Sequence, residues 1–261
     1  MILEFFSVTD TGRARRNNED SVALDEAGRI AVLADGMGGY NAGEVASGMA
    51  SERVRGELAT RLKSLGASPA DSEIRTALLD AVDSANREVY EAAMSHPEYA
   101  GMGTTLVVAL YRGDRLWLGH IGDSRAYRFR NGHLEQLTRD HSLLQEQIDA
   151  GLITAEQAAY SMHKNLVTRA VGVDELVDLE IHDHPVEPGD LLLMCSDGLS
   201  DMLGDEQIGQ LLRSNDSLPA VGAMLVQAAN AAGGRDNIAV ILARAKPGTR
   251  DSAKSWWSFW R

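Results

Sequence analysis

The segment Ile30-Ala31-Val32-Leu33-Ala34-Asp35-Gly36 joins a short apolar run to an Asp-Gly pair. The run has the length and composition of a buried β-strand, and Asp-Gly is a typical turn. The same arrangement recurs at 116–123, where the run ends in Gly-Asp, and at 191–198, where it ends in Ser-Asp-Gly. Near the C-terminus the order is reversed, because Asp236-Asn237 precedes the apolar run 238–243. The pattern predicts buried strands whose ends each expose a carboxylate.

Helical patterns occur in blocks between groups of strands. Two long helices are predicted at 42–63 and 70–94, the second entered through Ser68-Pro69 as N-cap and first helical residue. Shorter helices are predicted at 143–150, 155–159, 205–212 and 218–231, and further strands at 104–110, 115–121, 126–130 and 134–137. Because the strands are joined by hairpin-sized turns and do not alternate with helices, the sequence predicts an α+β fold with mostly antiparallel sheet.

Length and composition indicate a folded acidic chain of one domain or two small ones. The 261 residues are 44% hydrophobic, and 25 Lys and Arg stand against 38 Asp and Glu, for a net charge of −13. This acidity argues against a nucleic-acid partner, because phosphate backbones are bound by clustered basic residues. The apolar runs are strand-sized and no basic leader segment is visible, so a cytoplasmic location is expected.

The single cysteine excludes an internal disulfide framework. A cysteine phosphatase would need an arginine six positions after its nucleophile, and the residue six positions after Cys195 is Asp201. We therefore expect Cys195 to be a buried strand residue.

Five aspartates carry the chemistry that the strand ends suggest. They are Asp20, Asp35, Asp123, Asp197 and Asp236. Taken singly, an Asp-Gly pair is most simply a turn. Taken together, five carboxylates at strand ends suit Mg²⁺ or Mn²⁺, which prefer oxygen ligands, and a two-metal site needs several converging carboxylates.

Seven segments in order carry a resemblance to a known family. They are TGRARRNNED (11–20), ADGMGG (34–39), GMGTT (101–105), GDSR (122–125), the stretch from DHS (140–142) through Gly172, SDGL (196–199) and GRDN (234–237). In this order they resemble the metal-dependent protein phosphatases of the PPM, or type 2C, family in their bacterial form. The resemblance spans roughly residues 5 to 243.

The resemblance implies a four-layer αββα sandwich, in which two central antiparallel sheets are flanked by helices. The phosphatase domain is expected to cover residues 1–245, with a mobile helical flap at about 140–166 beside the active site. Thr154 and Gln157 form a predicted capping box within that flap.

A site follows from the same resemblance, position by position. Asp35 would bridge two tightly bound Mn²⁺ or Mg²⁺ ions and help to activate a water molecule, and Gly36 would supply a backbone carbonyl. Asp20, Asp197 and Asp236 would complete the two-ion site. Asp123 would share a third, weaker ion with Asp197, and Arg15 would bind the substrate phosphate, whose geometry suits a guanidinium.

The implied activity is hydrolysis of phosphoserine and phosphothreonine on proteins by a metal-activated water, in opposition to a Ser/Thr kinase. A monomer is expected. One alternative is an inactive regulatory module of the same fold. Only Tyr40 supports this alternative, since bacterial members of the family often have His at this position. Another is a metal-dependent phosphodiesterase or nuclease, which conflicts with the acidic charge.

Four histidines have no place in the implied ligand set. His163 is the one that could approach the leaving group, although an exposed loop position is the simpler expectation. His182 and His184 are predicted to be surface residues, and His141 to fix the turn before the flap.

The segment 246–261 differs in composition from the rest of the chain. It holds three of the four tryptophans, four basic residues and one acidic residue. Such a tail suits a membrane interface or a partner groove. A disordered end, or a segment that packs back on the domain, is the alternative.

Overall fold

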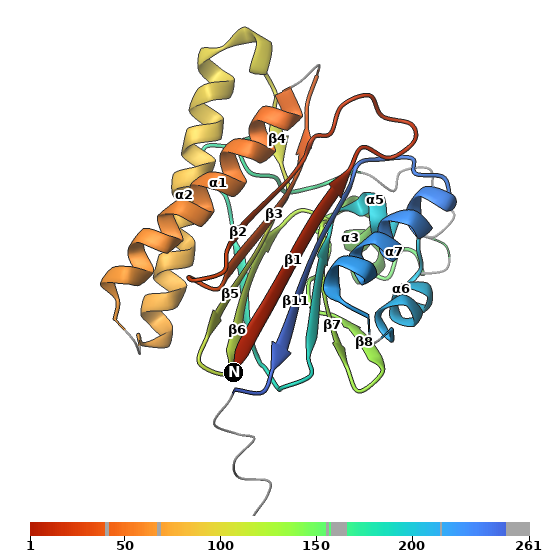
Figure 1. Ribbon diagram of the computed structural model, residues 1–261. Helices are drawn as coiled ribbons and strands as arrows, with labels where there is room; N and C mark the ends of the chain where they lie inside the picture. The colour runs from red at the N-terminus through yellow and green to blue at the C-terminus, as the bar shows by residue number, and fades with distance from the viewer. Residues whose placement is uncertain (40–41, 67–68, 155–156, 158–165, 215, 249–261) are drawn as a thin grey trace, which may run out of the picture.

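The computed structural model describes residues 1–39, 42–66, 69–154, 157, 166–214 and 216–248. Two antiparallel sheets pack face to face, and helices cover both outer faces (Figure 1). This arrangement confirms the expected αββα sandwich.

The first sheet has the strand order β1-β11-β10-β7-β8. Its strands are β1 (Ile2–Asp10), β7 (Arg125–Arg130), β8 (His133–Gln136), β10 (Leu191–Cys195) and β11 (Ile238–Lys246). The second sheet has the order β2-β3-β5-β6-β9, and β4 pairs with β3. Its strands are β2 (Asp20–Asp25), β3 (Ile30–Met37), β4 (Gly103–Thr104), β5 (Leu106–Arg112), β6 (Arg115–Ile121) and β9 (Glu180–Pro185).

Alternation along the strands divides the core into three apolar layers. In β3, Ile30 and Val32 belong to the cluster beneath the helices, whereas Ala31 and Leu33 belong to the cluster between the sheets. By the same alternation, Val240 in β11 belongs to a third cluster, which lies beneath the helices on the opposite outer face. Because successive side chains of a strand point to opposite faces, a fully apolar strand suits a position covered on both sides. The cluster between the sheets therefore packs the two sheets against each other.

The helices divide between the two faces. Helices α1 (Ala42–Ser64) and α2 (Asp71–Ser95) cover the second sheet, and the short η1 (Pro97–Tyr99) follows them. Helices α5 (Asp197–Ser200), α6 (Asp205–Leu212) and α7 (Leu218–Ala231) cover the first sheet. The predicted start of α2 at residue 70 is one residue early, and Pro69 is not its first helical residue: the N-cap is Ala70, whose N–H donates to the Glu73 carboxylate at 2.7 Å. An acidic residue in the first turn thus begins the helix, after Pro69.

Part of the predicted flap is described. Helix α3 (Leu143–Asp149) begins at Ser142, whose Oγ accepts a hydrogen bond from the Gln145 N–H. The predicted capping box is present, since Thr154 N–H donates to Gln157 and Gln157 N–H donates to the Thr154 hydroxyl. Most of the helix predicted at 155–159, together with Tyr40, Ser68 and His163, lies outside the described residues.

The last strand extends to the start of the predicted tail. Lys246 closes β11 opposite Ile2, and its Nζ lies 2.7 Å from the Glu4 carboxylate. Residues 249–261 lie outside the described part of the chain. Within the described ranges, no helix combines the length and apolar character needed to cross a membrane.

Candidate active site

A cavity of about 250 Å³ opens where loops and strand ends from distant parts of the chain meet. It is lined by Arg15, Glu19, Asp35, Gly36, Met37, Gly38, Thr105, Asp123, Val167, Asp197 and Asp236. Six of the seven predicted site residues are in this lining. The seventh, Asp20, lies beside them, because its partner in the register of β2 and β3 is Asp35.

Asp20 is buried with one oxygen satisfied and the other not. Its Oδ2 accepts a hydrogen bond from the Ser196 hydroxyl at 2.7 Å, whereas its Oδ1 has no hydrogen-bond partner among the described residues. Burial raises the pKa of Asp20 to about 7, and the charge of Asp236 adds to this effect. A buried carboxylate oxygen without a donor is costly in water-free surroundings and is well suited to a cation.

Two further carboxylates of the cavity, those of Asp35 and Asp197, also have raised pKa values. Enclosure raises the pKa of Asp35 well above its ordinary value, and the charges of Asp20 and Asp197 raise it further. Burial, followed by the neighbouring charge of Asp123, does the same to the pKa of Asp197. Several crowded carboxylates that resist ionisation form an oxygen-rich donor set, so the residues present fit a site for hard divalent cations.

Arg15 lies at the edge of this acidic cavity, and its side chain is 52% exposed. Its Nη2 is 2.7 Å from Oδ2 of Asp236, and this hydrogen bond raises the pKa of the guanidinium. The arginine therefore remains charged and accessible, as recognition of a phosphate dianion requires.

Glu19 also lines the cavity and is absent from the predicted set. Burial raises the pKa of its carboxyl, although the charge of Arg15 works in the opposite direction. The only signal in the sequence is its position next to Asp20, because no strand-end pattern includes it.

Asn237 connects the last strand to the loop before β2. Its Nδ2 donates to the carbonyls of Thr11 and Asn17, and its Oδ1 accepts the N–H of Glu19 at 2.8 Å. The same residue approaches Gly198 so closely that a Cβ there would lie 1.8 Å from the Asn237 carbonyl oxygen. These contacts bring Asp197 and Asp236 to the same cavity.

His141 is placed as predicted, at the turn before the flap. Its Nδ1 accepts the backbone N–H of Gly122 at 3.2 Å, and its backbone N–H donates to the Gly122 carbonyl at 2.9 Å. His182 is exposed on β9, as predicted, and contacts Glu180. His184 is half-buried instead, because it borders a small apolar hollow between the sheets.

A second group of possible metal ligands is separate from the cavity lining. One donor atom from each of His120, His141 and Glu180 lies within 4.8 Å of the others. Three of the four ring nitrogens already have hydrogen-bond partners. His120 Nε2 contacts the Arg139 carbonyl, and the two ring nitrogens of His141 contact the Gly122 N–H and the Glu180 carboxylate. The two rings stack with an interplanar angle of 22°, so their in-plane lone pairs do not converge. This group acts as a hydrogen-bonded anchor.

Cys195 is fully buried in β10, as predicted, and burial raises the pKa of its thiol to about 12. The thiolate needed for nucleophilic attack is therefore negligible at neutral pH.

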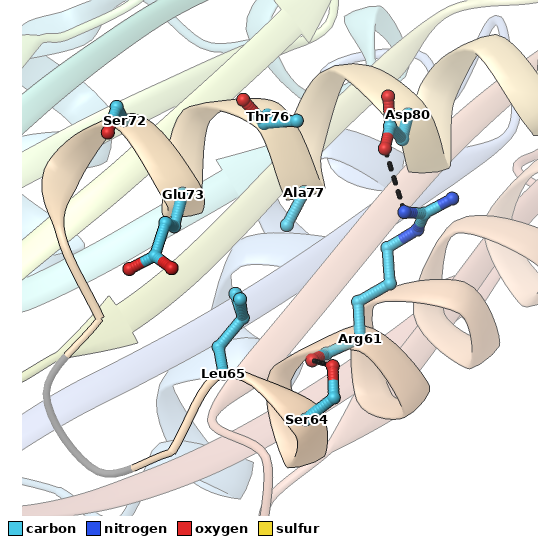
Figure 2. A pocket seen from close by; sticks show the side chains of 8 residues that line it. All are labelled: Arg61, Ser64, Leu65, Ser72, Glu73, Thr76, Ala77 and Asp80. Atoms are coloured by element: carbon cyan, nitrogen blue, oxygen red, sulfur yellow. Dashed lines mark hydrogen bonds and ion pairs between the residues drawn. The ribbon is translucent and has the colours of Figure 1, made fainter.

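Another hollow of about 250 Å³ lies between α1 and α2 (Figure 2). Arg61 at its side pairs with Asp80 at 2.7 Å, and Glu73 accepts the Ala70 N–H. The hollow is lined by the last turn of α1. This helix is about 35 Å long, and its first turn lies beside Gly36 and Gly38 at the carboxylate cavity. The hollow is thus remote from the carboxylates.

Comparison with known proteins gives consistent matches along the chain. The family model described as Protein phosphatase 2C matches residues 12–243. The serine/threonine phosphatase stp of Listeria monocytogenes is 38% identical over 237 residues, which cover 90% of this chain and 92% of that protein. The serine/threonine protein phosphatase PstP of Mycobacterium tuberculosis is 37% identical over 246 residues, which cover 93% of this chain and 45% of PstP.

Solved structures agree with these matches. The S. agalactiae serine/threonine phosphatase has a TM-score of 0.86 at 36% identity, and the match covers 94% of this chain and all of that one. The catalytic domain of PstP in complex with two manganese ions has a TM-score of 0.80 at 36% identity, with coverage of 94% and 99%.

Proposed function

The chain belongs to the protein phosphatase 2C family, and we propose that its reaction takes place in the carboxylate-lined cavity. Like its bacterial relatives, it is a protein serine/threonine phosphatase that depends on Mn²⁺ or Mg²⁺. One observation carries the assignment of the cavity. Five aspartates from separate segments converge there, and one of them keeps a buried oxygen without a donor.

We propose that Asp20, Asp35, Asp197 and Asp236, with the carbonyl of Gly36, hold two ions. Asp35 would be the ligand that both ions share, since the charges of four other aspartates act on its carboxyl and it is therefore the most central of the carboxylates. Asp123 and Asp197 hold a third, weaker ion. When bound, the ions lower the pKa of a water molecule and offset the charge of the phosphoryl group in transfer.

The protein's own groups then supply binding and orientation. Arg15 binds the phosphate oxygens from the edge of the cavity, with Asp236 holding the guanidinium. The Ser196 hydroxyl fixes the Asp20 carboxylate, and the Thr105 hydroxyl accepts the N–H of Asp35 at 3.0 Å. These bonds preorganise the ligands, because side chains held by neighbours lose little further freedom on binding.

An inactive regulatory module is not favoured. Loss of turnover would permit loss of ligands, whereas every predicted carboxylate is present at the cavity. Phosphoproteins are the substrates. We further propose that the enzyme acts as a monomer, opposes a cognate Ser/Thr kinase in the cytoplasm, where kinases find ATP, and can dock to a membrane or partner through its basic, Trp-rich tail.

Hydrolysis of p-nitrophenyl phosphate and of a phosphothreonine peptide tests the assignment. Both reactions should require Mn²⁺ or Mg²⁺, stop on addition of a chelator, and resume when the metal is restored. Rates that stay at background with saturating Mn²⁺ would contradict the proposed use of this cavity.

A further inference from the structure

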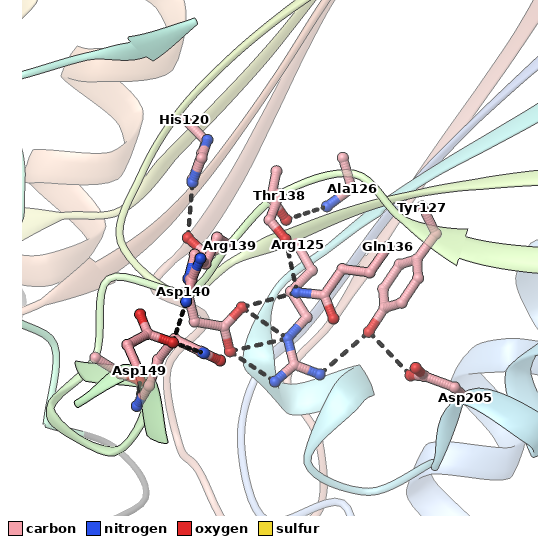
Figure 3. A network of polar contacts seen from close by, with 12 residues as sticks. His120, Arg125, Ala126, Tyr127, Gln136, Thr138, Arg139, Asp140, Asp149 and Asp205 are labelled. Atoms are coloured by element: carbon pink, nitrogen blue, oxygen red, sulfur yellow. Dashed lines mark hydrogen bonds and ion pairs between the residues drawn. The ribbon is translucent and has the colours of Figure 1, made fainter. Parts of the chain in front are cut away.

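The loop 122–124, which carries Asp123, is fastened to the root of the flap by a set of contacts that we call the clasp. Figure 3 shows two of these contacts, His120 with Arg139 and Arg125 with Asp140. On one side the clasp consists of His120, Gly122 and Arg125, and on the other of Arg139, Asp140 and His141. His120 contacts the Arg139 carbonyl at 2.8 Å, and Gly122 and His141 exchange two hydrogen bonds. The clasp thus holds residues on both sides of Asp123.

The ion pair of Arg125 and Asp140 is the strongest part of the clasp. Arg125 donates from Nε to both carboxylate oxygens at 3.0 Å, and from Nη2 to Oδ2 at 2.6 Å. The two side chains are only 27% and 10% exposed. Forked, charge-assisted bonds of this kind fix direction as well as distance.

Neighbouring side chains fix both members of the pair. Gln136 donates to Asp140 at 3.1 Å, and Arg125 donates from Nη1 to the hydroxyl of Tyr127, which in turn donates to Asp205 (Figure 3). The pair therefore has a single defined geometry, tied to β7, β8 and the start of α6.

A second anchor ties the same loop to the two-ion site. The Ser124 hydroxyl lies 2.8 Å from the Thr105 hydroxyl, which accepts the N–H of Asp35. The loop is thus held between Asp35 on one side and the flap root on the other. The position of the Asp123 carboxylate relative to Asp35 depends on both anchors.

We propose that Arg125 and Asp140 are positioning residues that hold Asp123 in place for a third divalent ion. The inference rests on the proposed function, because it assumes that Asp123 is a ligand. Neither residue lines the cavity, so in this proposal they act on the ion indirectly, by fixing the loop that carries Asp123.

Charge alone predicts the opposite effect for Arg125. Burial and the charge of Asp140 raise the pKa of the Asp123 carboxyl, whereas the positive charge of Arg125 lowers it. The same positive charge repels a cation bound nearby. If Arg125 acted only by charge, its removal would tighten the third site. If it positions Asp123, its removal weakens that site.

Mn²⁺ titration of the full chain distinguishes these roles, with free Mn²⁺ followed by its EPR signal. Arg125→Gln should retain the two tight ions and bind the third at least about tenfold more weakly, as is typical for lost outer partners of ligands. Arg125→Lys keeps the charge but not the fork, so it should also weaken the third site. Arg128→Gln is the matched control, because it breaks an exposed ion pair with Glu135 on the same hairpin.

Unchanged or tighter third-site binding in Arg125→Gln would overturn the proposal, and if that variant does not fold, unchanged binding in Arg125→Lys would do so. A wild-type chain that binds two ions and no third would also overturn it, while leaving the two-ion function intact. A wild-type chain that binds no Mn²⁺ would instead reject the proposed function.

Discussion

Asp20 and Asp35 are direct partners in the antiparallel register of β2 and β3, although they carry the same charge. Like charges directly opposite each other destabilise a sheet. Here the pair is also enclosed, and both pKa values are raised. Without metal the fold therefore holds an electrostatic cost at this position, which the proposed divalent cations would remove.

Metal should stabilise the protein against unfolding. At a Mn²⁺ concentration about a thousandfold above its Kd, binding to the folded state alone adds about 4 kcal/mol to the free energy of unfolding. We expect the melting temperature, measured by differential scanning fluorimetry, to rise by several degrees with Mn²⁺ and to fall again with chelator. An unchanged melting temperature would contradict the presence of the site.

The metal-free protein should lose stability as the pH rises. The pKa of Asp20 is about 7 in the folded state against an ordinary value of 3.8. Its contribution is therefore complete below about pH 4 and is lost as the pH rises through 7. Urea unfolding between pH 4 and 8 should show a smaller decline in Asp20→Asn than in the wild type, and equal declines would count against this origin.

Arg15→Ala should weaken substrate binding without loss of metal. A hydrogen bond to a charged group is worth about 1.5–3 kcal/mol, so KM for p-nitrophenyl phosphate should rise on the order of tenfold to a hundredfold. Mn²⁺ affinity should be retained, because Asp236 loses a competing cation. Arg16→Ala is the control, because Arg16 is the exposed neighbour of Arg15 and is absent from the cavity lining. Loss of Mn²⁺ in Arg15→Ala would mean that its role is misassigned.

Two glycines should respond in opposite ways to alanine. A Cβ on Gly198 would lie 1.8 Å from the Asn237 carbonyl oxygen, so Gly198→Ala must displace the segments that carry Asp197 and Asp236. Urea unfolding should show a loss of stability, and Mn²⁺ binding should weaken. Gly56 is inside α1 with open space around its Cβ position, so Gly56→Ala should stabilise by up to about 1 kcal/mol. Wild-type behaviour of Gly198→Ala would contradict the close approach.

The thiol should have no part in the reaction. Because Cys195 is buried and its pKa is about 12, iodoacetamide should leave the folded enzyme active at neutral pH. Cys195→Ala should keep its Mn²⁺-dependent rate, with some loss of stability from the small cavity. Inactivation by iodoacetamide at the rate of an exposed thiol would reject this assignment.

Local pattern was sufficient to predict the strands that end in carboxylates. The run before Asp35 and the run before Asp197 are buried strands, because apolar residues covered on both faces leave a strong signal. The strand-end pattern also grouped the five aspartates, whereas the four layers, the role of each ligand and Arg15 followed only from the ordered resemblance. Spacing alone does not bring Ser196 to Asp20 across 176 positions, since that contact depends on how the two sheets pack.

The errors have local causes. Ser68-Pro69 has the composition of a helix start, but the Glu73 carboxylate accepts the Ala70 N–H and the helix begins at Asp71. A surface position was expected for His184 because no further metal ligand accompanies it in the sequence, yet it lies at the border of the layer between the sheets. Glu19 was missed because no strand-end pattern includes it, whereas the fold holds its backbone against Asn237 and places it in the cavity lining.

The most direct test of the central claim is Mn²⁺-dependent hydrolysis of a phosphothreonine peptide by Asp35→Asn, measured together with the number of bound ions. Asp25→Asn, at the opposite end of β2, is the matched control. We predict that Asp35→Asn binds fewer ions and hydrolyses the peptide no faster than the chelated wild type, whereas Asp25→Asn retains both properties. Wild-type ion stoichiometry and rate in Asp35→Asn would contradict the account.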